Sequence, residues 1–178
     1  MELRTDRLLL RQWRAADREM FARLNADAQV MQHFPAVLSR EESDRLADRI
    51  ESHIAQHAWG LWAVEIPTVA PFVGFIGLAQ PRFNAHFTPC TEIGWRLCGE
   101  VWGHGYATEG ALAVLAFGLH TLGLNEVVSF TVPDNVRSRR VMERIGMTHN
   151  PSDDFDHPEL SVGHRLRSHV LYRSSKAA

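Results

Sequence analysis

Three stretches in the middle of the chain have the apolar character of β-strands. They run from Leu61 to Ile66, from Phe72 to Leu78 and from Thr91 to Leu97. Prolines, which cannot donate a hydrogen bond to a strand ladder, separate them. Because consecutive strands usually pair as neighbours, the three stretches predict an antiparallel meander.

The N-terminal part predicts a strand followed by two helices. Leucines among arginines favour a strand within residues 3–13, and helical spacing of apolar residues follows over residues 15–30. A second helix is expected to begin at Ser39, with Glu42 three residues later. In this pairing each side chain can satisfy an exposed backbone donor of the other residue. The helix is predicted to end near His57.

The C-terminal part alternates between helical and strand patterns, with glycines at the predicted helix ends. Residues 150–158 are polar and predict a loop, and residues 174–178 predict a frayed, disordered tail. The remaining predicted elements are a helix over 108–122, a strand over 127–132, a short helix over 136–145 and a last strand over 162–172.

This order of elements predicts an α/β protein, a mixed sheet flanked by helices. The chain has 178 residues with 45% hydrophobic content, which suits one domain with a substantial core. Without an internal repeat or linker in the sequence, we expect a single domain over residues 1–173.

Charge and cysteine usage restrict the kind of partner and the compartment. A net charge of −2 provides no general attraction to nucleic acid or to an anionic membrane, so an anion site must be local. The N-terminus lacks the apolar core of a secretion signal, which predicts a cytoplasmic protein. Cys90 and Cys98 lie on one predicted strand, roughly 26 Å apart, and cannot form a disulfide.

A glycine-rich turn at residues 102–109, between a strand and a helix, is the clearest functional signal. Such a turn directs backbone N–H groups into a concavity at a helix N-terminus, which can bind phosphate or pyrophosphate. A dinucleotide fingerprint fits poorly, because Thr108 occupies its third glycine position and the turn follows a meander. A Walker loop is excluded since no Gly-Lys-Ser/Thr follows.

Two segments at a suitable separation resemble the GNAT superfamily of acetyl-CoA-dependent N-acetyltransferases. They are residues 97–109, LCGEVWGHGYATE, and residues 135–147, NVRSRRVMERIGM. The opening residues 4–11 and the closing residues 169–173 are similar to the RimJ/RimL-like branch, which acetylates N-termini of ribosomal proteins. The resemblance implies the GNAT fold, a central mixed and largely antiparallel sheet splayed in a V and flanked by helices.

The resemblance also implies a coenzyme site. Residues 102–107 fill the family pattern Q/R-x-x-G-x-G/A, whose backbone amides hold the coenzyme A pyrophosphate, although Trp102 replaces the usual Gln or Arg. Main-chain groups of Trp95 and Leu97 are expected to pair with the pantetheine arm, and Asn135 to fix the same arm. The full expected set is Trp95, Leu97, Trp102, Gly103, His104, Gly105, Tyr106, Ala107, Thr108, Asn135 and Arg140.

Acetyl transfer requires a base for the amine and a proton for the leaving thiolate. Glu92 is the candidate base, directly or through a water molecule, although it could instead pair with Arg96 on the polar side of the strand. Many family members carry a tyrosine where this chain has Met142. Ser138 is therefore the candidate acid, although its hydroxyl could instead bind a backbone N–H in the first helical turn.

Other side chains allow alternative interpretations. Phe34, Trp59 and Trp62 could wall an acceptor pocket or belong to the core. The spacing of His53 and His57 places both on one helix face, but no third ligand follows, and no metal site is predicted. Cys98 could be proposed as a nucleophile, although a strand cysteine is usually a buried apolar residue.

The sequence thus predicts a transferase that moves acetyl from acetyl-CoA to a primary amine by direct attack in a ternary complex. The expected acceptor is a protein N-terminal α-amine, such as that of a ribosomal protein. A small amine, amino acid or antibiotic as acceptor, and an acyl-CoA-sensing module without turnover, are the alternatives. We expect neither nucleic acid nor a membrane as partner. The sequence leaves the oligomeric state open, with a homodimer as one alternative.

Overall fold

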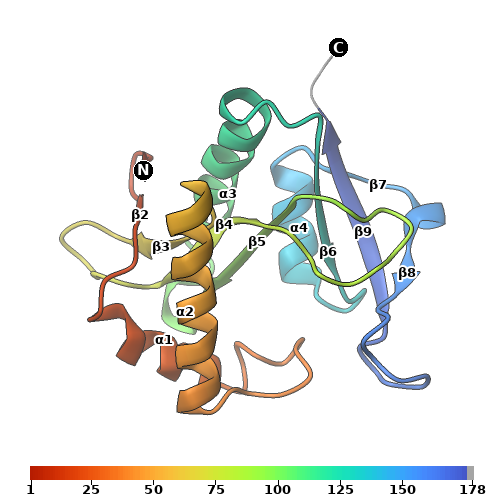
Figure 1. The fold of residues 1–178 in the computed structure, drawn as a ribbon, viewed down its shortest axis with the longest axis horizontal. Coiled ribbons are helices and arrows are strands. Elements are labelled where there is room, and N and C mark those ends of the chain that lie inside the picture. The colour runs from red at the N-terminus through yellow and green to blue at the C-terminus, as the bar shows by residue number, and fades with distance from the viewer. Residues whose placement is uncertain (176–178) are drawn as a thin grey trace.

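The computed structural model describes residues 1–175, which form one large sheet with helices on both faces (Figure 1). Its strands are β1 (Leu3–Arg4), β2 (Leu9–Arg11), β3 (Leu61–Glu65), β4 (Gly74–Ala79), β5 (Glu92–Leu97), β6 (Glu126–Thr131), β7 (Thr148–His149), β8 (Phe155–Asp156) and β9 (Ser168–Ser175). Its helices are α1 (Asp17–Ala26), α2 (Arg40–His57), α3 (Tyr106–Ala116) and α4 (Val136–Arg144), with shorter helical turns η1 (Gly99–Val101), η2 (Phe117–Thr121) and η3 (Pro151–Asp153).

The strand order is β1-β2-β3-β4-β5-β6-β9-β7, with β8 paired to β9. Every neighbouring pair is antiparallel except β5 and β6, which run parallel. The predicted meander over β3, β4 and β5 is confirmed. Whereas β4 pairs with all of β5, β6 pairs with it at one position, Glu92 opposite Val128. The two strands separate beyond this position, which confirms the predicted splayed, mixed sheet.

Two hydrophobic clusters lie on opposite faces of the sheet. Helices α1 and α2 lie side by side and cover one face, where Phe21 and Ile50 pack against Phe75 of β4 (Figure 1). Helix α3 covers the other face, where Val114 packs with Ile93 of β5. Alternating residues of β5 therefore face different helices. Because of this alternation, the side chains of β5 divide between the two sides of the gap where β5 and β6 separate.

The second predicted helix is confirmed together with its N-terminal cap. The Ser39 hydroxyl accepts a hydrogen bond from the Glu42 backbone N–H, and the Glu42 carboxylate accepts one from the Ser39 backbone N–H. The first helix is shorter than predicted, because α1 ends at Ala26. Among the helices of residues 1–175, none has the length and apolar character to cross a membrane.

Several predicted boundaries are wrong. The first strand is divided into β1 and β2 by a turn in which the Thr5 backbone N–H donates to the Leu8 carbonyl. The predicted loop at 150–158 contains η3 and β8. The last strand begins at Ser168 and continues to Ser175, two residues into the predicted tail, and residues 176–178 lie outside the described part of the chain.

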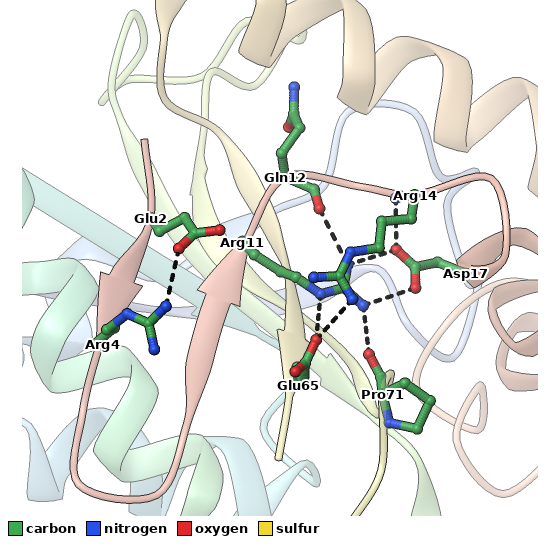
Figure 2. A network of polar contacts seen from close by, with 8 residues as sticks. All are labelled: Glu2, Arg4, Arg11, Gln12, Arg14, Asp17, Glu65 and Pro71. Carbon is green, nitrogen blue, oxygen red and sulfur yellow. Dashed lines mark hydrogen bonds and ion pairs between the residues drawn. The ribbon is translucent and has the colours of Figure 1, made fainter. Parts of the chain in front are cut away.

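A buried arginine links the N-terminal strands to the rest of the domain. The Arg11 side chain is 1% exposed and makes two hydrogen bonds to the Asp17 carboxylate, with N–O distances of 2.8 and 2.9 Å (Figure 2). Its Nε donates to Glu65 at 2.7 Å, and further donors bond the carbonyls of Gln12 and Pro71. Two carboxylates and two carbonyls thus compensate one buried cation.

Candidate active site

A cavity of about 1190 Å³ occupies the opening between β5 and β6. It extends from the glycine-rich turn to the segments around residues 30–35 and 157–169. The structure brings together around it every predicted site residue except His104: Glu92, Trp95, Leu97, Trp102, Gly103, Gly105, Tyr106, Ala107, Thr108, Asn135, Ser138 and Arg140.

The backbone of the turn has the geometry of an anion site. Gly103 and Gly105 have φ angles of 82° and 83°, a left-handed conformation that residues with a Cβ atom rarely adopt. A Cβ atom at Gly103 would meet no heavy atom within 4 Å, so the space over the turn is open. Gly105 caps α3 without a side-chain hydrogen bond. The first N–H groups of α3 therefore remain available for an anion.

The N-terminal segment holds this turn in place. The Glu109 carboxylate accepts hydrogen bonds from the Arg7 backbone N–H at 2.8 Å, from Arg7 Nε at 2.7 Å and from the Thr5 hydroxyl at 2.6 Å. Arg7 also donates to the His104 carbonyl and lies over the Tyr106 ring. The His104 imidazole is exposed and within hydrogen-bond distance of the Trp102 carbonyl, 3.0 Å away. His104 therefore does not line the cavity, unlike its neighbours Gly103 and Gly105.

One edge of β5 is free where the pantetheine arm is expected. The Cys98 N–H donates to the carbonyl of Val73, just before β4, whereas the Ile93 carbonyl accepts from the Ser129 hydroxyl of β6. Because main-chain groups alternate in direction along a strand, those of Trp95 and Leu97 face the opening, as those of Ile93 do. The Leu97 carbonyl accepts a 2.9 Å hydrogen bond from the Trp102 indole. The N–H and C=O of Trp95 and the N–H of Leu97 remain for a ligand. Trp102 thereby ties the end of β5 to the turn.

Asn135 and Ser138 lie at the start of α4. The Asn135 side chain caps the helix by accepting from the Ser138 backbone N–H, and it donates to the Thr131 hydroxyl at 2.9 Å. The Ser138 hydroxyl lines the cavity and has no hydrogen-bond partner among residues 1–175. The alternative in which this hydroxyl binds a backbone N–H does not occur there. Met142 is buried, and Tyr172 is bonded to Glu143 and does not line the cavity. Tyr106 does line it, at the start of α3, with the Arg7 guanidinium over its ring.

The arginines of α4 divide between two directions. Arg137 and Arg140 line the cavity, and the Arg137 guanidinium lies 4.5 Å from the centre of the Trp102 ring. Arg139 points away and donates to the Tyr172 hydroxyl. A spacing of three residues on a helix explains why Arg137 and Arg140 share a face. Arg144 also lines the cavity, and sequence reasoning assigned no role to it.

Glu92 begins β5 on the face opposite Ile93 and borders the cavity. Its carboxylate makes no hydrogen bond or ion pair with a residue in 1–175, so the alternative of a salt bridge with Arg96 is not observed. Burial raises the pKa of Glu92 to about 8. A carboxylate with this pKa can accept a proton from an amine close to neutral pH.

The aromatic candidates have different environments. Trp62 is 0% exposed and packs edge-to-face on Phe117, which confirms its place in the core. Trp59 packs against His53 and His57, outside the cavity. Phe34 lines the cavity. Of the three, it alone is positioned to contact an acceptor.

The structure does not favour Cys98 as a nucleophile or His53 and His57 as metal ligands. Burial, more than nearby acidic groups, raises the pKa of Cys98 to about 11, so its thiol stays protonated at neutral pH. Cys98 does not line the cavity. The rings of His53 and His57 lie 4.5 Å apart, and within residues 1–175 no group of three or more potential metal ligands occurs.

Sequence reasoning missed two residues of β5 that share the face of Glu92. Gly94 leaves the face open, because a Cβ atom there would meet only the Glu92 carboxylate, 3.9 Å away. Arg96 borders the same cavity beside Phe34. The period of the strand placed both residues on this face, but the sequence alone did not show that the face lines a cavity.

The comparisons with known proteins give one family. Residues 7–148 match the family model described as an acetyltransferase (GNAT) domain. The uncharacterised N-acetyltransferase YnaD of Bacillus subtilis is 28% identical over 148 residues, covering 83% of this chain and 82% of that protein.

Solved structures agree in fold. An acetyltransferase of the GNAT family from Bacillus anthracis superposes with a TM-score of 0.81 at 26% identity, covering 98% of each chain. RimL, the ribosomal L7/L12 α-N-protein acetyltransferase in complex with coenzyme A, superposes with a TM-score of 0.76, covering 98% of each chain. At 15% identity, the second likeness shows the fold alone.

Proposed function

This chain belongs to the GNAT acetyltransferase family, and from that premise we propose that it acetylates the α-amine of a protein N-terminus. The family gives the reaction, N-acetyl transfer from acetyl-CoA. The acceptor class is our proposal. It rests mainly on Glu92, a carboxylate of raised pKa at the point where β5 and β6 separate.

The donor side of the cavity suits coenzyme A. We place its pyrophosphate on the amides that follow Gly103 and Gly105, with the cations of Arg137 and Arg140 beside them. The pantetheine arm would pair with the free main-chain groups of Trp95 and Leu97. The thioester provides an activated acyl carbonyl at the opening between the strands.

The acid–base properties of Glu92 favour an α-amine as the acceptor. A free α-amine has a pKa of roughly 8, whereas that of lysine is near 10.4. A base with a pKa of about 8 is matched to the first and weak for the second. Glu92 takes the proton that the amine loses as its nitrogen forms the new bond to the acetyl carbon.

The leaving thiolate needs a proton when the carbon–sulfur bond breaks. The Ser138 hydroxyl lines the cavity and is free of hydrogen bonds to residues 1–175, so we assign the donation to it. Met142 cannot donate a proton, and Tyr172 is bonded to Glu143 away from the cavity. Much of the acceleration would come from holding amine and thioester together in this cavity.

Thiol release from acetyl-CoA tests the proposal. The acceptors would be short peptides with free N-termini, the same peptides with blocked N-termini and one internal lysine, and a panel of small amines. We expect release with the free N-termini and at least tenfold slower release with the lysine peptides. Faster release with small amines would favour a small-molecule acetyltransferase. Background release with all of them, together with a raised melting temperature in coenzyme A, would favour a sensing module.

A further inference from the structure

Arg96 is a cation inside the cavity without an opposing charge. It lies on β5 on the same face as Glu92, and protein surrounds its guanidinium on most sides. Within residues 1–175 its one hydrogen bond goes to the Asn25 side-chain oxygen, and its Nε is buried without a partner. No carboxylate of these residues lies within 4 Å of it. Burial lowers the pKa of Arg96 to about 10, so the desolvated charge is poorly compensated.

The other buried arginine of the domain shows what compensation requires. Arg11 has the carboxylates of Asp17 and Glu65 and two backbone carbonyls around its donors (Figure 2). Arg96 has one neutral amide oxygen. A desolvated guanidinium without a counter-ion destabilises the fold. The difference between the two arginines is that Arg96 borders a cavity that a ligand can enter.

The guanidinium of Arg96 is held in one orientation. It stacks on the Phe34 ring at 4.2 Å and lies 5.4 Å from the centre of the Phe75 ring. Asn25 is fixed in turn, because its side-chain N–H donates to the Ser43 hydroxyl at 2.9 Å in the contact between α1 and α2. A preorganised, planar donor group of this kind is suited to bind a carboxylate through two parallel hydrogen bonds.

The path between Arg96 and Glu92 is open. The two residues are four apart on one strand face, about 13 Å between Cα atoms in an extended strand. Gly94 lies between them and has no side chain, and the Glu92 carboxylate leans over it. An acceptor lying over Gly94 would direct its amine to Glu92 and its other end to Arg96. This face is opposite the one that packs on α3.

We propose that Arg96 is a specificity-determining residue that binds a carboxylate of the acceptor, so that the preferred substrate is an amine that also bears a carboxylate. This inference rests on the proposed function, because Glu92 defines where the amine lies. The carboxylate can come from two sources. One is the side chain of an acidic residue at the first or second position of a protein N-terminus, and the other is the α-carboxylate of a free amino acid.

Matched acid and amide pairs separate these sources. One arm uses amidated tripeptides with Asp or Asn, or with Glu or Gln, at position one or two. The other arm uses free amino acids and their α-amides. We expect the wild-type kcat/KM, measured by thiol release, to favour the acid by about thirtyfold in one arm, as a charge-assisted bidentate contact would give. The arm that shows the preference identifies the source.

Three variants link the preference to this residue. In Arg96→Gln the ratio of acid to amide should fall to about one, because kcat/KM is lost mainly for the acid substrates. Arg96→Lys should retain a reduced preference, because it keeps the charge without the fork geometry. Arg18→Gln, a change of a similar arginine on α1 outside the cavity, should leave the ratio unchanged. Melting temperatures establish that each variant folds.

Three results would overturn the inference while leaving the proposed function in place. The first is equal rates for acid and amide in the wild type, and the second is an equal fall for both in Arg96→Gln. The third is weaker coenzyme A binding in Arg96→Gln, which would place the residue on the donor side. If no amine in the panel releases thiol, the proposed function fails. In that case, calorimetry of the acid and amide pairs with the coenzyme A-loaded protein tests Arg96. The acid should then bind with a Kd about thirtyfold lower than that of the amide.

Discussion

Among single residues, Glu92 combines a raised pKa with a place at the opening of the sheet. At pH 6 most of the wild-type carboxylate is protonated and cannot accept a proton, because its pKa is about 8. We therefore expect kcat/KM to rise as the pH increases through 8, following both Glu92 and the α-amine of the substrate. Glu92→Gln should lower the plateau at least tenfold and leave a profile that follows the amine alone. A variant with the wild-type rate and profile would exclude Glu92 as the base.

The same shift affects stability, with a sign that follows from proton binding. Between the ordinary glutamate pKa near 4.5 and about 8, the folded state holds a proton on Glu92 that the unfolded state has released. Raising the pH across this range therefore favours the unfolded state. Glu92→Gln removes this contribution, so its melting temperature relative to the wild type should be higher at pH 9 than at pH 5. A constant difference would mean that the carboxylate is not desolvated.

Ser138 can be tested apart from binding. Its hydroxyl lines the cavity, but its backbone N–H is what the cap of α4 uses, so Ser138→Ala should leave the helix intact. We expect kcat to fall about tenfold or more with an unchanged coenzyme A affinity, measured by steady-state kinetics and calorimetry. Ser138→Thr, which keeps a hydroxyl, is the matched control and should retain more activity. Equal rates in the wild type and both variants would mean that solvent, and not Ser138, supplies the proton to the leaving thiolate.

Of the structural elements, the turn before α3 depends on a contact with the N-terminal segment. Glu109 binds Thr5 and Arg7, and Arg7 in turn binds the His104 carbonyl. Glu109→Gln keeps the shape but weakens the charge-assisted bonds, which should free the turn and weaken coenzyme A binding about three- to tenfold by calorimetry. Glu100→Gln changes an exposed carboxylate of the neighbouring turn η1 and should have no effect. Equal affinities in the two variants would show that the turn holds its shape without the contact.

Long elements with strong local signals could be predicted from the sequence. The cap of α2 needs only Ser39 and Glu42, and the meander over β3 to β5 follows from apolar runs between prolines. Strands β7 and β8 have two residues each and exist because they pair with β9. Such short strands have no pattern of their own. The division of the first strand likewise depends on a turn closed by Thr5, which local spacing does not reveal.

The candidate site also has parts with a local sequence signal and parts that depend on distant residues. The turn could be found because glycines are required where φ is positive, as at Gly103 and Gly105. The significance of Arg96 could not be predicted, because it depends on Asn25 and Phe34, about seventy and sixty residues earlier in the chain. Its lack of a counter-ion is visible only when all of its neighbours are known.

In the whole molecule, few contacts join β5 to β6 across the cavity. Besides the pairing at Glu92 and Val128, the Ser129 hydroxyl bonds the Ile93 carbonyl. On the far side, Arg165 donates to the Gln32 carbonyl and connects the two segments that border the acceptor end. The halves of the sheet therefore meet near the start of β5 and separate around the cavity. A ligand that contacts both halves would add contacts that the protein alone lacks.

Coenzyme A should accordingly stabilise the whole domain and protect the opening in particular. At a hundredfold excess over Kd, binding to the folded state adds about 2.7 kcal/mol, which corresponds to a rise in melting temperature of about 5–10 °C for a domain of this size. Hydrogen exchange should slow at the amides of Trp95 and Leu97 on β5 and also in α4 near Asn135, since the proposed site draws on both halves. Strand β2, which does not line the cavity, should show only the global effect. Protection confined to the turn before α3 would mean that the coenzyme binds one half, and the proposed path of the pantetheine arm along β5 would then be wrong.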